Sequence, residues 1–406
     1  MNADQPIVVV GAGHAGAQLC MALAAEGQGP RVHLVGNEGT LPYQRPPLSK
    51  SFLKAPVEPL QWLRNAEWFD QQGITVHRDD PAVEIDRRSQ RVRLRSGRDL
   101  PYHRLVLATG TRARWPVGLP PALSNVFALR DAGQAHRLRT ALDQVQHLTV
   151  LGGGFIGLEV AATARHLGMA VTLMEAAPRL LGRSTSPELA EHVRRTHLAN
   201  GIDCRLGVTV DGFEMEGDEL RSCRVNGQRE AVQALVLGIG ASPESSLAQA
   251  AGLACDQGVL VDEHLRTSDE AILAIGDCSR FPARHGGWLR LESIQNANDQ
   301  ARVAAATLMG RSHPYRPMPW FWSDQGTLRL QMAGLVPTDG QCFRRPGAAP
   351  ASFSLLHYLA DKLVCVESVN APADHLAARK LLEAGLSPQP AIACDANYPL
   401  KDCLRA

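Results

Sequence analysis

Two stretches of the chain share one pattern of apolar and polar positions: an apolar run of strand length, a glycine-rich turn and a helix-length segment. The first is PIVVVGAGHAGAQLCMALAAEG, beginning at Pro6, and the second is HLTVLGGGFIGLEVAATARHLG, beginning at His147. Another short apolar run, RVHLVGNE or AVTLMEAAP, follows each of them. The pattern predicts a strand, a turn, a helix and a further strand, twice. The first glycines of the turns, Gly11 and Gly152, lie 141 residues apart (152 minus 11), which indicates a duplicated domain rather than a solenoid repeat.

The rest of the chain continues this pattern and then departs from it. The segments RLVLATGTRARWP, QALVLGIGASPESS and HLRTSDEAILAIGDCSR contain apolar strands that end in glycine turns. Beyond about Pro319, LRLQMAGL, ASFSLLHYL and KLVCVESVN are typical of antiparallel strands, and a helix is predicted from about Pro372 to Ala384. The predicted fold class is α/β, with two Rossmann-like dinucleotide-binding domains and a C-terminal α+β domain. We expect the first domain to comprise residues 1–110 and 244–319, the second residues 111–243, and the third residues 320–406.

The overall charge points to no highly charged partner. The chain has 42 Lys and Arg against 41 Asp and Glu, so no net field attracts nucleic acid or a membrane surface. The uncharged stretch Ile7–Ala25 is interrupted by glycines and His14, and no positive segment precedes it. We therefore expect neither a signal peptide nor a membrane span, and a cytoplasmic protein.

Cysteine spacing argues against several chemistries. The nine cysteines include no CxxC or CxxxxC pair, and the closest two, Cys394 and Cys403, are nine residues apart. No Cys/His cluster has metal-ligand spacing, so we expect no metal site. The cysteines are expected to be reduced residues of the core.

Each glycine turn has the GxGxxG spacing of a dinucleotide site. Glycines at these positions let a pyrophosphate approach the start of a helix, where backbone N–H groups and the helix dipole favour negative charge. One such turn is weak evidence, but two turns, each between an apolar strand and a helix, indicate two dinucleotide sites. Two sites require two dinucleotides, and the simplest combination is FAD with a nicotinamide dinucleotide. The alternative is that one site binds its dinucleotide and the other is a duplicate that has lost the ability to bind one. The turns comprise Gly11, Gly13 and Gly16, and Gly152, Gly154 and Gly157.

An acidic residue is expected some twenty residues after each turn, where it binds the adenosine ribose. Glu175 lies eighteen residues after Gly157 (175 minus 157) and would repel a 2′-phosphate, so NADH is favoured and NADPH is possible but weaker. Arg179 and Arg183 follow closely and weaken that exclusion. In the first copy the corresponding residue is Asn37, which can bind a ribose without charge, with Glu38 beside it.

Seven segments, in order, carry a family resemblance: GAGHAG, PYQRPPLSK, LVLATG, GGGFIGLEVAATA, TSDEAILAIGDCSRF, RLESIQNANDQAR and PWFWSDQ. Together they resemble the FAD-dependent ferredoxin reductases of bacterial oxygenase systems, the putidaredoxin reductase and Rieske dioxygenase reductase type. The resemblance covers essentially the whole chain, and RPPLSK and PWFWSDQ are its most specific parts. It implies a glutathione-reductase-like arrangement of the two nucleotide domains.

The resemblance assigns Lys50 and Glu159 to the reactive edge of the flavin. Proline restricts φ, so Pro46 and Pro47 reduce the conformational freedom of the loop that carries the lysine. A cation there favours the anionic reduced flavin, and relatives pair it with the acid that Glu159 matches. The alternative for Glu159, which we expect at the start of a helix, is a simple interaction with the helix dipole.

The remaining site residues follow from the same resemblance. Asp277 could instead be a simple helix N-cap rather than a cofactor contact, and Trp320 could instead be an ordinary aromatic residue of the core. For the nicotinamide dinucleotide, the implied contacts are Gly152, Gly154, Phe155, Ile156, Gly157, Glu159, Glu175, Arg183 and Gly240. For FAD, they are Gly11, Gly13, His14, Ala15, Gly16, Asn37, Glu38, Arg45, Pro46, Lys50, Val83, Ala108, Thr109, Gly110, Arg130, Asp277, Glu292, Ser293, Ile294 and Trp320.

The missing cysteine pairs exclude a disulfide relay, which leaves direct transfer through the flavin. The resemblance implies hydride transfer from NADH to flavin N5, then two one-electron transfers to a [2Fe–2S] ferredoxin of Rieske or vertebrate type. That ferredoxin would feed a P450 or Rieske-type oxygenase of aromatic hydrocarbon catabolism, and the reductase would be a monomer or weak homodimer. Two alternatives are an NADH diaphorase or oxidase, and a redox sensor similar to apoptosis-inducing factor. Basic clusters that could dock an acidic ferredoxin are Arg311 with Arg316 and Arg344 with Arg345.

Overall fold

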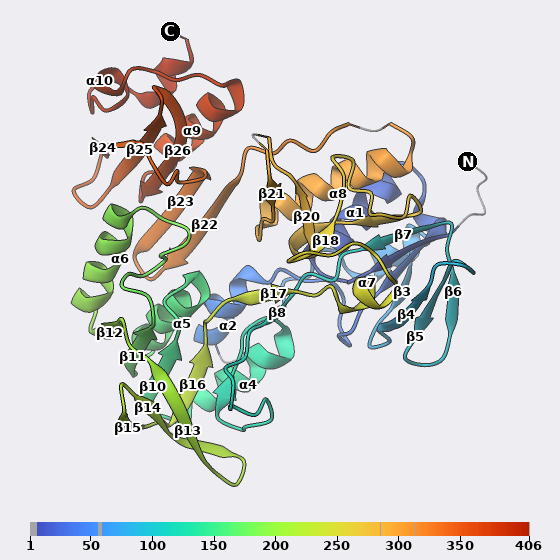
Figure 1. Cartoon of the computed structure of the whole chain (residues 1–406), viewed down its shortest axis with the longest axis horizontal. Coiled ribbons are helices and arrows are strands. Elements are labelled where there is room, and N and C mark those ends of the chain that lie inside the picture. Colours follow the sequence, from blue (N-terminus) through green and yellow to red (C-terminus); the bar gives the residue numbers. More distant parts are fainter. Residues whose placement is uncertain (1–5, 56–58, 285, 312, 406) are drawn as a thin grey trace. The chain divides into compact units, whose positions relative to one another are not determined.

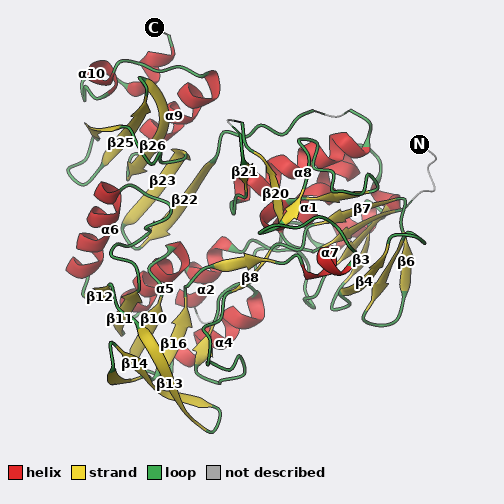
Figure 2. Ribbon diagram, in the orientation of Figure 1, coloured by secondary structure: helices red, strands yellow, loops and turns green. Residues whose placement is uncertain are grey.

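The computed structural model describes residues 6–55, 59–284, 286–311 and 313–405. By internal contacts the chain divides into two compact units. Figure 1 colours the chain by residue number, and Figure 2 colours it by secondary structure. The first unit comprises Met1–Arg45, Leu60–Arg112 and Ala241–Pro317, and the second Pro46–Pro59, Ala113–Gly240 and Met318–Ala406.

The first unit is built on a parallel sheet with strand order β19-β7-β1-β2-β3. Opposite Val10 at the end of β1 lie Val35 of β2 and Leu107 of β7, so these strands end at one row. All four residues of β1 are buried, as expected for a parallel sheet covered on both faces. The strands are β1 (Ile7–Val10), β2 (Val32–Val35), β3 (Thr75–His77), β7 (Arg104–Leu107) and β19 (Ile272–Ala274).

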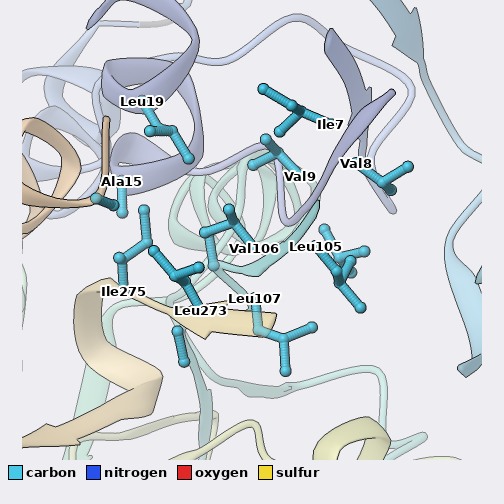
Figure 3. Packing of buried hydrophobic residues seen from close by; sticks show 14 of the residues in the cluster. Ile7, Val8, Val9, Ala15, Leu19, Leu105, Val106, Leu107, Leu273 and Ile275 are labelled. Atoms are coloured by element: carbon cyan, nitrogen blue, oxygen red, sulfur yellow. The ribbon is translucent and has the colours of Figure 1, made fainter. Parts of the chain in front are cut away.

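The main core of this unit joins that sheet to helices α1 (His14–Ala25) and α8 (Ile294–Leu308). Figure 3 shows Val9 of β1, Leu19 of α1 and Leu273 of β19 within the same cluster of apolar side chains. This packing fixes the carboxyl edge of the sheet, where α/β proteins place their ligands.

Smaller elements complete the first unit. Two further three-stranded sheets have the orders β4-β5-β6 and β18-β20-β21; the first is antiparallel, and in the second β18 pairs with β20 in parallel and β20 with β21 antiparallel. Their strands are β4 (Ala82–Asp86), β5 (Arg91–Leu94), β6 (Asp99–Pro101), β18 (Val259–Leu260), β20 (Ser279–Pro282) and β21 (Trp288–Leu289). The short helices are η1 (Gly29–Arg31), α3 (Ala66–Gln71), α7 (Ser246–Ala250) and η3 (Gly276–Cys278). Strands β8 (Thr111–Ala113) and β17 (Ala241–Pro243) pair where the chain passes from one unit to the other and back.

The second unit repeats the parallel arrangement, with strand order β12-β11-β10-β16-β9. Leu151 at the end of β10 lies opposite Met174 and Leu237, the same relation as in the first unit. The elements are β9 (Val126–Phe127), β10 (His147–Leu151), β11 (Ala170–Glu175), β12 (Ile202–Leu206), β16 (Ala234–Leu237), α4 (Ala132–Leu142), α5 (Phe155–His166) and α6 (Pro187–Ala199). An antiparallel sheet adds β13 (Val210–Glu216), β14 (Glu219–Val225) and β15 (Gln228–Ala231).

The proline-rich segment differs from its expected form. It is expected to be a loop without regular structure, but Pro46–Ser49 is a 3₁₀ helix, η2, and Ser51–Lys54 forms a turn of α-helix, α2. Proline fixes φ near the value that such turns require, so the two adjacent prolines favour this helix.

The C-terminal part of the second unit is the predicted α+β fold. An antiparallel sheet has the order β22-β23-β26-β25-β24, and α9 (Pro372–Ala384) matches the predicted helix. Leu356, Val366 and Leu381 belong to the apolar cluster that joins the sheet to α9. The strands are β22 (Trp320–Gln325), β23 (Leu328–Gly334), β24 (Gln341–Pro346), β25 (Phe353–Leu359) and β26 (Lys362–Val369), followed by α10 (Pro390–Ala393) and η4 (Leu400–Leu404).

A buried ion pair ties this sheet to the start of α6. Nε2 of His357 lies 2.9 Å from Oε2 of Glu367, and Oε1 of Glu367 accepts the backbone N–H of Ser186, also at 2.9 Å. Burial by itself lowers the pKa of His357, but hydrogen bonds to Cys342 and Glu367 and the charge of Glu367 outweigh it and raise the pKa to about 9. The imidazole of His357 is therefore protonated at neutral pH.

We expect stability to fall at alkaline pH because of this pair. The pKa of His357 rises on folding from 6.5 to about 9, so its contribution is complete below pH 6.5 and is lost as the pH rises through about 9. That contribution amounts to about 3 kcal/mol. Urea unfolding between pH 7 and pH 10 measures it, with the exposed His166→Gln as the matched control for His357→Gln. An equal loss of stability between pH 7 and pH 10 in His357→Gln would contradict this origin.

Candidate functional site

Two glycines of the first turn are required by the fold itself. Gly11 has φ of +116°, and a Cβ there would lie 2.1 Å from the carbonyl oxygen of Ala108. A Cβ on Gly16 would lie 2.0 Å from the carbonyl oxygen of Gly11, because α1 packs directly against the turn. No real Cβ approaches a backbone oxygen so closely, so neither position accepts a side chain without a shift of the backbone.

The middle glycine, Gly13, has no such reason inside the protein. The nearest atom to a Cβ there is Nε of Arg45, at 3.9 Å. Gly13 is also the N-cap of α1, which has neither a capping side chain nor an acidic residue in its first turn. An open space at an uncapped helix start, with a guanidinium beside it, fits the pyrophosphate of a dinucleotide.

The second turn reproduces this geometry. A Cβ on Gly152 would lie 2.4 Å from the carbonyl oxygen of Gly238, and a Cβ on Gly157 would lie 2.2 Å from the carbonyl oxygen of Gly152. At Gly154, the N-cap of α5, the nearest atom is 3.6 Å away. This likeness favours two working cradles over one cradle and a decayed copy.

The uncapped starts of α1 and α5 stand out from the other long helices in the described part of the chain. Both lack a capping side chain and a first-turn acid. The remaining helices of eight or more residues have one or the other, namely Asp131 at α4, Ser186 at α6, Ser293 at α8 and Asp374 in α9. The two helix starts that follow glycine turns are thus the ones left open to an external anion.

Most residues expected to contact FAD lie in the first unit. Asn37 and Glu38 follow β2, Ala108–Gly110 follow β7, and Asp277 lies in η3 after β19, so they reach the same carboxyl edge as the glycine turn. His14 and Ala15 open α1, and Nε2 of His14 lies 2.9 Å from Oδ1 of Asn298 on α8. Thr109 donates from Oγ1 to the Glu244 carbonyl at 2.5 Å, which closes the turn after β7.

The other expected contacts of this unit have identifiable local roles. Glu38 accepts hydrogen bonds from Tyr43 at 2.5 Å and from Arg45 at 2.7 Å, so it orients the guanidinium beside Gly13. Ser293 caps α8, with Ile294 as the first helical residue, and Glu292 pairs with Arg290 at 2.6 Å. Val83 lies on β4 at a bulge, and its side chain is 52% exposed.

Glu175 ends β11, as the sequence predicts, but it also holds the second turn together. Oε2 accepts the N–H of Gly153 at 2.6 Å, and Oε1 accepts the N–H of Ala177 at 2.7 Å. Arg183 is exposed, and its Nη2 lies 3.3 Å from where a Cβ on Gly240 would stand. Arg179 instead donates to the carbonyls of Thr185 and Gly182.

Lys50 and Glu159 form a nearly buried ion pair within the second unit. Nζ of Lys50 lies 2.6 Å from Oε2 of Glu159, whose side chain is 5% exposed. The expectation that Glu159 begins its helix is wrong: α5 begins at Phe155, and Glu159 lies one turn further along, facing inward. Its carboxylate is therefore a buried partner of the lysine rather than a dipole partner at the helix start.

Hydroxyl groups complete the surroundings of this carboxylate, and the sequence did not single them out. Ser49 donates to Oε2 of Glu159 at 2.5 Å, and Ser323 donates to Oε1 at 2.7 Å. Gln325 then bonds Ser323 at 3.1 Å and faces Nε2 of His197 at 2.9 Å. Burial lowers the pKa of His197, so this chain of hydrogen bonds ends on a neutral imidazole. Both serines lie inside the RPPLSK and PWFWSDQ motifs, which is the signal that could have identified them.

The remaining expected contacts of the second unit are dispersed. Trp320 stacks with Trp322 at 5.9 Å, lies under the guanidinium of Arg379 at 4.0 Å, and borders a groove of about 330 Å³. Phe155 packs edge-on against Phe321, and Ile156 is exposed. Pro46 opens η2, and the backbone N–H of Arg130 is held by Gln134 ahead of α4.

One docking expectation is wrong. Arg345 is 5% exposed and bonds Asp374 and the carbonyls of Ala393, Asp395 and Tyr398, so it is a structural residue. Its neighbour Arg344 is exposed and pairs with Glu188. The other two arginines of the expected clusters, Arg311 and Arg316, pair with Glu26 and Glu263.

Neither a membrane helix nor a metal cluster is found among the described residues. No helix there is long and apolar enough to cross a bilayer. No group of three or more His, Cys, Asp or Glu residues there has the geometry to hold a metal ion.

Known proteins match this chain along nearly its whole length. Residues 5–301 match the family model of the pyridine nucleotide-disulphide oxidoreductases, and residues 320–404 match the reductase C-terminal model. Rhodocoxin reductase of Rhodococcus erythropolis is 42% identical over 97% of this chain and 93% of its own length. The ferredoxin–NAD(+) reductase component of the anthranilate 1,2-dioxygenase system of Burkholderia cepacia is 38% identical over 100% of both chains. The solved covalent complex of putidaredoxin reductase with putidaredoxin matches with a TM-score of 0.93 and 37% identity, over 100% of this chain and 99% of that one.

Proposed function

Because the chain belongs to the pyridine nucleotide-disulphide oxidoreductase family and its near relatives are ferredoxin reductases, we propose that it transfers electrons from NADH through FAD to a [2Fe–2S] ferredoxin. The family match confirms the predicted fold class and the class of enzyme, an oxidoreductase that uses FAD and a nicotinamide dinucleotide. By analogy with the named relatives, the ferredoxin serves a P450 or Rieske-type oxygenase, in the cytoplasm, and the reductase is a monomer or weak homodimer.

The observation that carries the proposal is the pair of matched cradles. Each has a middle glycine without a steric reason inside the protein, at a helix start without a cap. We assign the cradle of residues 11–16 to FAD and that of residues 152–157 to the nicotinamide dinucleotide. The assignment keeps the predicted domains, 1–110 with 244–319 for FAD and 111–243 for NADH, with 320–406 as the third.

When bound, the flavin converts a two-electron donor into a source of single electrons, and the protein supplies binding and electrostatics. Arg45, oriented by Glu38, places positive charge beside the first cradle. Glu175 offers carboxylate oxygens at the end of β11 for ribose hydroxyls. Lys50 is held in one position by Glu159, and we propose that its charge acts at the flavin edge.

The nicotinamide preference provides a separate test. In Glu175→Ala we expect the preference for NADH over NADPH to narrow by about tenfold, because the repulsion of a 2′-phosphate is removed while Arg183 remains. Steady-state kcat/KM for both nucleotides measures it. The variant also loses the hydrogen bonds to Gly153 and Ala177, so Glu175→Gln is the control for loop geometry. Unchanged kcat/KM ratios in both variants would remove Glu175 from the ribose site.

Two measurements test the function itself. The purified protein should show flavin absorbance bands that NADH bleaches, and a colourless protein that takes up no added FAD would refute the cofactor assignment. Stopped-flow mixing of the NADH-reduced protein with candidate ferredoxins should then show fast cytochrome c reduction only when a ferredoxin is present. Equal rates without ferredoxin would favour a diaphorase or oxidase. Slow reoxidation with dimer formation would favour a redox sensor.

A further inference from the structure

One thiol outside the proposed site differs from all the others. Cys342 is the single exposed cysteine among the nine, all of which lie in the described part of the chain. Burial raises the pKa of each of the other thiols, which suppresses their thiolate forms. Cys342 lies instead on β24, an edge strand of the C-terminal sheet.

A histidine lies directly beside this thiol. Cys342 is opposite His357 on β25, and His357 is in turn opposite Cys365 on β26. Directly opposite residues of antiparallel strands project from the same face, with Cβ atoms about 4.5–5.5 Å apart. The side chains of Cys342 and His357 are therefore cross-strand neighbours on one face of the sheet.

Glu367 fixes the histidine from its other side. Nε2 of His357 is 2.9 Å from Glu367, so Nδ1 is the ring nitrogen left for Cys342. Glu367 is fully buried and is held in turn by the N–H of Ser186. A thiol, an imidazole and a carboxylate in this order form the arrangement by which proteins activate cysteine as a nucleophile.

The charges around the imidazole favour its protonated form at neutral pH. Although burial lowers the pKa of His357, Cys342 and Glu367 together raise it to about 9. Cys365 faces the ring from β26 and is itself buried. Arg344, the cation on the same face of β24, is paired with Glu188. The imidazolium therefore stands next to the exposed sulfur, where it attracts a thiolate.

We propose that Cys342, held beside His357 and Glu367, is a nucleophilic thiol that forms mixed disulfides with low-molecular-weight disulfides such as oxidised glutathione. The Cys342 sulfur attacks one sulfur of the small disulfide, so a new S–S bond forms as the original one breaks. The departing half leaves as a thiolate and takes up the proton that Cys342 released. Cys342 is oxidised and the departing half is reduced, and excess small thiol reverses the reaction. The site is independent of the proposed electron transfer.

The pH dependence of alkylation tests the arrangement in the unaltered protein. With iodoacetamide we expect one fast-reacting thiol, whose rate falls no more than about threefold from pH 8 to pH 6, because the imidazolium partner persists throughout. A thiol without such a partner slows about a hundredfold over that interval. A fall of that larger size would overturn the proposal.

Variants and an adduct mass complete the test. Oxidised glutathione should add the mass of one glutathionyl group, which dithiothreitol removes. Cys342→Ser should abolish the adduct, whereas Cys394→Ser, at a half-buried thiol, should leave it unchanged. His357→Gln should slow alkylation at pH 6 by about tenfold or more. If that variant fails to fold, the pH profile of the unaltered protein decides. An adduct on another cysteine, or none, would refute the proposal.

Discussion

Gly13→Ala is expected to leave the fold intact and to weaken FAD binding by at least about tenfold. Gly13 has φ of −83° and ψ of −164°, which alanine adopts freely, and no protein atom lies within 3.8 Å of the new Cβ. We therefore expect the free energy of unfolding of the flavin-free protein to change by less than about 1 kcal/mol. The methyl group would instead occupy the space that the pyrophosphate needs, and each tenfold loss of affinity corresponds to about 1.4 kcal/mol.

Gly16→Ala is the matched control, three residues away in the same turn. Its Cβ would meet the Gly11 carbonyl oxygen at 2.0 Å, so the backbone of the turn must shift. We expect a loss of about 3 kcal/mol or more in the flavin-free protein. Urea unfolding of the flavin-free variants, together with titration by FAD, separates loss of the fold from loss of the ligand.

The contrast between these two variants identifies what the middle glycine is for. If Gly13→Ala binds FAD as tightly as the unaltered protein, no group of the cofactor approaches that position closely. If Gly13→Ala is destabilised without FAD as strongly as Gly16→Ala, then the space beside Gly13 is not open in the folded, flavin-free protein. Gly154→Ala makes the corresponding test for the nicotinamide cradle, where the nearest atom is 3.6 Å away.

The turns could be predicted from sequence because their causes are local. The strand, the three glycines and the helix all lie between Ile7 and Ala25, and the steric demand on Gly16 arises from the carbonyl of Gly11 in the same turn. The end of β11 at Glu175 was predictable for the same reason, since periodicity fixes where an apolar strand stops.

The surroundings of Glu159 could not be predicted in this way. Its two serine partners are 110 and 164 residues distant in sequence, and only the packing of η2 and β22 against α5 brings them together. No spacing rule relates such segments. The resemblance named Lys50 as the partner, but it was silent on the hydroxyl groups and on His197, which complete the network.

Arg344 and Arg345 show a second limit. As adjacent residues they read as one basic cluster, yet they lie on β24, where successive side chains point to opposite faces. Arg344 reaches the surface and Glu188, whereas Arg345 points toward α9 and becomes buried. The sequence pattern predicts no strand for the segment that contains these two arginines, so it does not show that their side chains point to opposite faces.

Lys50→Met is expected to destabilise the protein by about 3 kcal/mol and to slow flavin reduction by NADH by at least about tenfold. The first effect follows because Glu159, nearly buried, would lose its cationic partner and keep only hydroxyl groups as partners, and breaking a buried ion pair from one side is costly. The second follows if the lysine charge acts at the flavin edge, since tenfold corresponds to about 1.4 kcal/mol of transition-state stabilisation.

Glu159→Gln separates these effects because it keeps the cation. Lys50 is 22% exposed, so solvent compensates in part for the lost partner, and we expect a cost of about 1 kcal/mol. Anaerobic stopped-flow with equal flavin content in every variant measures the rate, and urea unfolding measures the stability. A double variant that combines Lys50→Met with Glu159→Gln completes the set. If the lysine charge acts on the flavin, flavin reduction should be slow in Lys50→Met and in the double variant, which lack that charge, and nearly unaltered in Glu159→Gln. If the pair is only an anchor, the rate should follow stability instead, and the double variant, which leaves no unpaired charge, should recover part of both. A double variant that regains the rate of flavin reduction would therefore remove Lys50 from the flavin edge, while leaving its structural role in place.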